Sequence, residues 1–235
     1  MVKRIWEKFP SLAAAVRADH EAVGLHGHHD WVHAFRVGEV ARQVALEEWG
    51  DEHLSHLAGI AGLCHNADRV LAHGHRVHLP SIAVSCEGVD DLVEYWVGDV
   101  LNLEVVRLIV DAVLRHGAKN SPEDSKVCIA LMDADRVVNL DADLFPRSGQ
   151  YYHDLPVVDY KYFLDDQEAT YRSPKSVLRD IAYSLDWADP SSPVCVRTRL
   201  GKKMAGERVK IFRTFFDALK LQLAEEGMHP YPFVV

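Results

Sequence analysis

Two histidines and an aspartate, far apart in the chain, are the residues best suited to do chemistry together. His65 follows His33 by 32 residues, and Asp135 follows His65 by 70. Neutral imidazoles and a carboxylate are ligands that first-row divalent metals accept in proteins. If these side chains meet in the folded chain, they predict a metal site, to which Asn66 beside His65 could add an amide oxygen.

Helical periodicity dominates the segments that carry these residues. His65, His116 and Asp135 each stand four residues beyond an apolar position of an i, i+3, i+4 stripe. They should therefore point into a helical core, where an unpartnered polar group is costly and a shared metal would satisfy several groups at once. The apolar stripes run over residues 37–45, 54–61, 101–112 and 127–138.

Local signals predict where some of these helices begin. Asp30 is a candidate N-cap for the helix that carries His33. Ser121 followed by Pro122 suggests the start of the helix that carries Asp135. His29 lies four residues before His33, so the two would share a face if they stood on one helix.

The remainder of the chain suggests one all-α domain over residues 1–235, with its core at about 20–145. Periodicity lapses over 141–174, where Pro, Gly and many Tyr and Asp predict loops or a short hairpin. A helix is expected over 177–185, and a long amphipathic C-terminal helix over about 200–226.

Composition narrows the classes of protein. Apolar residues make up 48% and charged residues 26%, as in ordinary globular proteins. The net charge of −9 argues against duplex nucleic acid as a partner. No C-x-x-C pair occurs among the four cysteines, so neither a disulfide framework nor a zinc ribbon is indicated. With no signal peptide and no long apolar run, we expect a cytoplasmic chain without a membrane partner.

The order of the motifs resembles that of the HD-domain metal-dependent phosphohydrolases. Their ligands are a His, a His-Asp pair and a distant Asp, which His33, His65 and Asp135 match, whereas Asn66 replaces the Asp of the pair. The run Ala-Asp-Arg-Val-Val-Asn that ends at Asn139 is similar to the last motif of the (p)ppGpp hydrolase branch. The closing segment looks like the last helix of uncharacterised bacterial HD hydrolases.

This resemblance implies an HD-type helical bundle and a phosphohydrolase acting on a nucleotide or another small phosphate ester. A divalent ion (Mn, Fe, Ni, Zn or Mg) would activate water for attack on phosphorus. The metal ligands would be His33, His65, Asn66 and Asp135. The catalytic residues would be Asn66, Asp68, Arg36 and His116, with Asp68 or Glu39 as the base. The substrate contacts would be His29, Asn139 and Arg199. A homo-oligomer is compatible with this interpretation.

Asn66 also motivates a second interpretation, because an amide keeps the ligand oxygen but loses the charge. The chain could be a degenerate HD protein that binds a nucleotide as a sensor without hydrolysis. A third is a di-iron oxygenase on the same fold, for which His116 and the histidines of the segment 73–78 would supply extra ligands. The plainest alternative is that His65 is a core histidine hydrogen-bonded to an asparagine.

Overall fold

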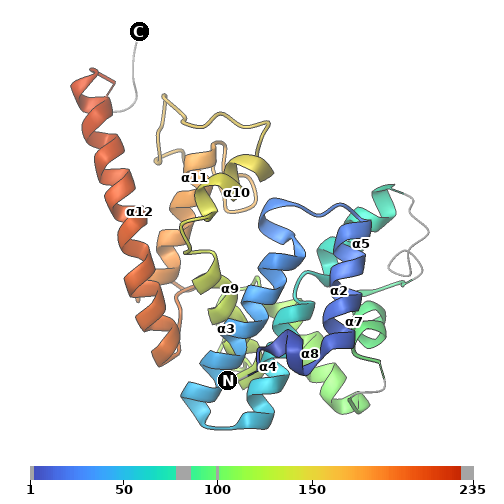
Figure 1. Ribbon diagram of the computed structural model, residues 1–235. Coiled ribbons are helices and arrows are strands. Elements are labelled where there is room, and N and C mark those ends of the chain that lie inside the picture. Colours follow the sequence, from blue (N-terminus) through green and yellow to red (C-terminus); the bar gives the residue numbers. More distant parts are fainter. Residues whose placement is uncertain (1–2, 78–85, 99–100, 229–235) are drawn as a thin grey trace.

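The chain folds into packed helices, as Figure 1 shows. The computed structural model describes residues 3–77, 86–98 and 101–228, without the side chains of residues 75–77. No strand occurs in these ranges, where Thr170 and Ser173 form an isolated bridge, so the all-α prediction is confirmed. The elements are α1 (Ile5–Lys8), α2 (Pro10–Ala22), η1 (Gly27–His29), α3 (Trp31–Trp49), α4 (Glu52–Cys64), α5 (Ala67–Val77), α7 (Val89–Val97), α8 (Leu103–Arg115), α9 (Lys126–Val138), α10 (Leu144–Tyr151), α11 (Val177–Tyr183), η3 (Ser184–Ala188) and α12 (Arg199–Glu225).

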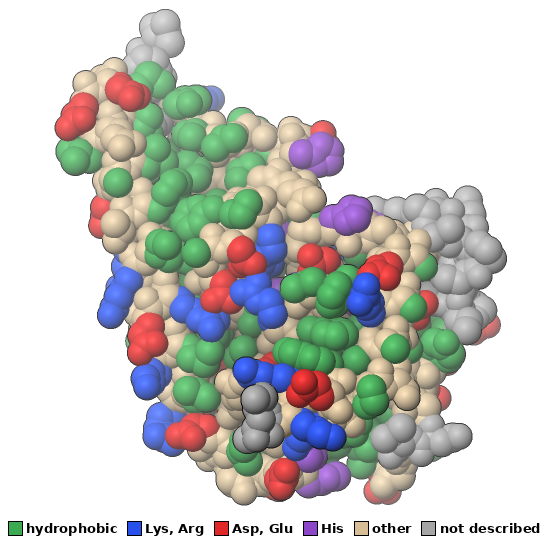
Figure 2. All heavy atoms as spheres, in the orientation of Figure 1, with side chains coloured by type: hydrophobic (Ala, Val, Ile, Leu, Met, Phe, Trp, Pro, Cys, Tyr) green, Lys and Arg blue, Asp and Glu red, His purple; other side chains and the backbone are tan. Residues whose placement is uncertain are grey.

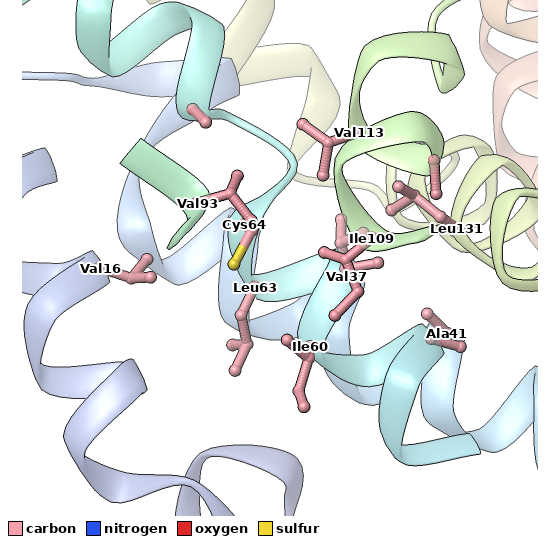
Figure 3. Close-up of a cluster of buried hydrophobic side chains, with 14 of the residues drawn as sticks. Val16, Val37, Ala41, Ile60, Leu63, Cys64, Val93, Ile109, Val113 and Leu131 are labelled. Atoms are coloured by element: carbon pink, nitrogen blue, oxygen red, sulfur yellow. The ribbon is translucent and has the colours of Figure 1, made fainter. Parts of the chain in front are cut away.

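The predicted apolar stripes form the main core, in which α3, α4, α8 and α9 pack together (Figure 3). Val37, Ile60, Ile109 and Leu131, one from each of these helices, are fully or almost fully buried. This packing brings together the helices that carry His33, His65 and Asp135.

A second apolar cluster joins the C-terminal helix to the rest of the molecule. Phe212 and Phe216 of α12 are buried with Leu144 of α10 and Ile181 of α11. Val40 of α3 packs against both clusters. Figure 1 shows α12 (red) along one side of the molecule, with α10 and α11 beside it. None of the described helices combines the length and apolar character needed to cross a membrane.

Side-chain caps fix several helix starts. The Asp30 carboxylate accepts a hydrogen bond from the His33 amide at 2.7 Å, so this predicted N-cap is confirmed. The start predicted at Ser121 is wrong, because Ser125 caps α9, which begins at Lys126. Asp124 instead forms ion pairs with arginines of α8 and of the segment before α12, which hold the preceding turn in place.

The segment 141–174, predicted as loops or a hairpin, contains the helix α10. Pro146 lies in its first turn, where a missing amide proton costs no helical hydrogen bond. The expected helix at 177–185 ends at Tyr183 and continues as the 3₁₀ helix η3, whereas α12 follows its predicted range closely.

Two glycines allow α3 and α4 to approach closely. A Cβ on Gly62 would lie 2.5 Å from the Cα of Gly38, so backbone lies directly against backbone here. Because His33 stands on α3 and His65 directly follows α4, this close approach sets the separation of the two imidazoles.

Glu39, an alternative base on sequence grounds, serves a structural role instead. Its buried carboxylate accepts hydrogen bonds from Arg42, Gln43 and the amide of Ile5. Burial alone would raise the pKa of Glu39, but these hydrogen bonds and the charge of Arg42 hold it at about 2. The Glu39 network thus ties α1 to α3.

The substitution Glu39→Gln is expected to lower the free energy of unfolding at pH 7 by about 2 kcal/mol, because Arg42 keeps its charge without a carboxylate partner. The native contribution is complete above the ordinary Glu pKa of 4.5 and is lost as the pH falls towards 2. Urea unfolding should therefore show the two proteins converging over this interval.

A carboxylate on the same helix provides the control for this substitution. Glu47 is half-exposed and pairs with Arg199 at the surface, so Glu47→Gln should change stability by less than about 0.5 kcal/mol. Equal effects of the two substitutions, or a Glu39→Gln effect independent of pH, would contradict the assignment.

Candidate metal centre

Three predicted ligands meet in the folded chain. His33 lies in the first turn of α3, His65 caps the C-terminus of α4, and Asp135 lies in α9. Each offers one ligand atom, and these atoms all lie within 4.8 Å of one another. Asp135 Oδ1 lies 3.1 Å from His33 Nε2 and 3.9 Å from His65 Nε2. The group could hold a metal ion.

The hydrogen bonds of the His65 ring fit a metal ligand. Nδ1–H donates to the carbonyl of Gly62 at 2.7 Å, which leaves the lone pair on Nε2. This Nε2 is buried and has no hydrogen-bond partner among the described residues. An orphaned acceptor next to a carboxylate is what a metal ligand looks like when its other nitrogen is held by the protein.

The charges of the cluster are also those that a cation requires. Burial lowers the pKa of His65 to about 3 and that of His33 below its ordinary value, so both rings are neutral. Burial would raise the pKa of Asp135, but the hydrogen bond from His33 holds it well below its usual range. The cluster therefore combines two neutral imidazoles with one negative charge.

Asn139 and Arg147 hold the Asp135 carboxylate through a chain of hydrogen bonds. Asn139 Nδ2 donates to Asp135 Oδ1 at 3.0 Å, and Arg147 Nη1 donates to Asn139 Oδ1 at 3.3 Å. Asn139, predicted as a substrate contact, lines the pocket but also orients the carboxylate. Sequence reasoning missed Arg147 because its helix, α10, was expected to be a loop.

Asn66 and His29 contact each other beside the cluster. His29 Nδ1 donates to Asn66 Oδ1 at 3.2 Å, and Asn66 is almost fully buried. His29 and His33 do not stand on one helix, because His29 belongs to η1 and Asp30 separates it from α3, so the face that they would have shared does not form. The structure nevertheless brings His29 to the same pocket.

His116 and Asp68 also line the pocket. The His116 ring lies 5.4 Å from that of His65, and its Nδ1 is bonded to the carbonyl of Val113 at 2.5 Å. Asp68 stands in the first turn of α5, which begins directly after Asn66, and its side chain is about half-exposed. Both are thus placed where a ligand in the pocket could reach them.

Two predicted arginines lie outside the pocket. Arg36 is paired with Asp141 and Asp143, and Arg199 with Glu47 at the surface. These acidic partners come from distant parts of the chain, so the sequence did not reveal them. Of the histidines at 73–78, His73 lies in α5, and the side chains of His75 and His78 fall outside the described residues.

The pocket has a volume of about 450 Å³ and extends well beyond the three ligands. Much of its wall consists of residues to which the sequence analysis assigned no role. Most of these residues lie between the start of α10 and the end of η3, and one lies on α5. They are unmarked by any motif, and they reach the pocket only through the fold. These additional lining residues include Arg69, Tyr151, Tyr152, Tyr171, Arg172, Asp180 and Trp187.

Comparison with known proteins identifies the fold alone. No protein-family model matches the sequence, and neither does any curated protein. A crystal structure of a Listeria innocua protein matches with a TM-score of 0.50 and 18% identity, covering 92% of this chain and 97% of that one. A Lactobacillus plantarum protein matches with a TM-score of 0.56 and 16% identity, covering 96% and 100%. Both were structural genomics targets.

Proposed function

We propose that this protein is a metal-dependent phosphohydrolase of the HD type, acting on a nucleotide or another small phosphate ester. The observation that carries the proposal is the convergence of His33, His65 and Asp135, with a buried, unpartnered Nε2 on His65. The order of these three residues is the one that the family resemblance requires.

A divalent ion held by these residues would lower the pKa of a coordinated water and polarise a phosphoryl oxygen. The chain's own groups then do the rest. Asn139 and Arg147 keep the Asp135 carboxylate in place. Asp68 is a carboxylate within the pocket that can take a proton from the attacking water.

Charge on the phosphoryl oxygens would be stabilised by groups that line the pocket. Arg69 and Arg172 do so, and they replace the arginines expected from the sequence, Arg36 and Arg199. His116 lines the same pocket, and its ring is oriented by the hydrogen bond between its Nδ1 and a backbone carbonyl.

The test combines metal content with turnover. The protein is dialysed against chelator, and Mn²⁺ or Ni²⁺ is added back. We expect a rise in melting temperature, and hydrolysis of p-nitrophenyl phosphate or of a nucleoside phosphate only with metal. His65→Ala should lose both effects. The control His53→Ala, an exposed position on α4, should keep them.

The outcomes separate the alternatives. A protein that no metal stabilises, and that hydrolyses nothing with metal, overturns the proposal. Metal binding by a wild type that is inert on phosphate esters, with turnover gained in Asn66→Asp, would favour the nucleotide sensor. An iron content near two per chain would favour the oxygenase.

A further inference from the structure

Aromatic side chains form one wall of the metal pocket. Tyr151 of α10 is the centre of this wall, with its ring centroid 5.2 Å from that of His28, 5.4 Å from that of His29 and 4.8 Å from that of Tyr152. Tyr171 lines the same pocket from the segment between α10 and α11. We call these five residues the aromatic wall.

Two rings of the aromatic wall are available to a ligand. Tyr151 is 39% exposed and Tyr171 is 54% exposed, although both line a pocket. Large aromatic rings left uncovered at a cavity offer flat apolar faces. Any of the nucleobases can stack on such a face, because each has a flat ring. The wall therefore suits a substrate that carries a flat ring.

A carboxylate lies at the same part of the pocket. The Asp180 side chain is 10% exposed, and its Oδ2 accepts a hydrogen bond from Ser148 at 2.6 Å and lies 3.6 Å from His28 Nε2. These contacts use Oδ2, so Oδ1 remains as an acceptor for a ligand. A flat ring with N–H donors satisfies both the aromatic faces and this acceptor.

The charge of the pocket limits the number of phosphates. The described lining includes the carboxylates of Asp68, Asp135 and Asp180 and the guanidinium groups of Arg69 and Arg172, a formal excess of one negative charge. Arg69 is already 3.6 Å from the Asp68 carboxylate. A divalent ion would leave an excess of one positive charge, which suits a single phosphate ester of about two negative charges.

The geometry points to a nucleoside monophosphate as the substrate, and we propose that the aromatic wall and Asp180 bind its base while the metal cluster binds its phosphate. The phosphate half rests on the proposed function; the base half does not. A nucleoside monophosphate would leave the occupied pocket with an excess of about one negative charge, whereas a triphosphate would leave an excess of about three.

Equilibrium binding to the metal-free protein tests the base subsite by itself. Adenosine, guanosine, cytidine and ribose are titrated by calorimetry. We expect at least one nucleoside to bind and ribose not to bind. Tyr151→Leu should weaken that binding at least tenfold, whereas Tyr151→Phe should keep it within about threefold. The control Tyr160→Leu, an exposed tyrosine outside the pocket lining, should change nothing.

Turnover with Mn²⁺ then tests the number of phosphates. We expect kcat/KM for the matching nucleoside monophosphate to exceed that for ribose 5-phosphate, and that for the nucleoside triphosphate, at least tenfold. Equal values for ribose 5-phosphate, or unaltered nucleoside binding in Tyr151→Leu, would overturn the base subsite. A preferred triphosphate would overturn the charge argument. Nucleoside binding without any phosphate ester hydrolysis would overturn the proposed function but not the base subsite.

Discussion

Replacing Asp135 with alanine is expected to weaken Mn²⁺ binding at least 100-fold and to reduce phosphate ester hydrolysis to background. Asp135 is the anionic member of the cluster, since burial keeps His33 and His65 neutral. Two imidazoles without a carboxylate neither offset the charge of the ion nor complete its coordination. Every step that requires the metal would be lost with it.

Thermal melts at several metal concentrations measure this loss directly. At a Mn²⁺ concentration of one hundred times the wild-type Kd, the wild type should gain about 2.7 kcal/mol of stability, and Asp135→Ala should gain no more than about 0.4 kcal/mol. Asp68→Asn is the control for binding, because this carboxylate lines the same pocket but lies outside the three-residue cluster. Its metal-induced shift should match the wild type. A normal metal response in Asp135→Ala would place the ion elsewhere.

Two members of the cluster, His65 and Asp135, were predictable because each stands one helical turn beyond an apolar position. A polar residue one helical turn beyond buried positions should point inward, and His65 and Asp135 do so: His65 is almost fully buried, and Asp135 keeps 21% of its side chain exposed. The N-cap at Asp30 followed from the same local logic. These signals depend only on residues within one or two helical turns, and such local spacing can be read directly from the sequence.

The outer half of the pocket was not predictable in this way. Two of the buried positions of α10 are the polar residues Arg147 and Ser148, so the helix lacks the stripe that marks the others. Its tyrosines reach the pocket only because α10 contacts η1 and α11. The position of Arg36, predicted as a catalytic residue, was not predictable for a related reason: it lies outside the pocket and is paired with Asp141 and Asp143, which are distant in sequence.

The packing of α3 against α4 yields the second prediction of large effect. Gly62→Ala is expected to lower the free energy of unfolding by about 3 kcal/mol, because the added methyl meets backbone, which cannot rotate away. Its Cβ would lie 2.5 Å from the Cα and 2.7 Å from the nitrogen of Gly38. The helices must separate. The His65 ring donates a hydrogen bond to the Gly62 carbonyl, so it must move away from His33 together with α4.

Metal binding should therefore fall together with stability, although Gly62 is not itself a ligand. Metal–ligand distances tolerate only about 0.2 Å of error, less than the separation that the methyl imposes. Urea unfolding gives the stability, and Mn²⁺ titration under conditions where the variant remains folded gives the affinity. Gly206→Ala, with open space around its Cβ on α12, is the matched control and should stabilise the protein by about 0.5–1 kcal/mol. If Gly62→Ala lost stability but bound Mn²⁺ as tightly as the wild type, the contact between the two glycines would not set the geometry of the metal centre.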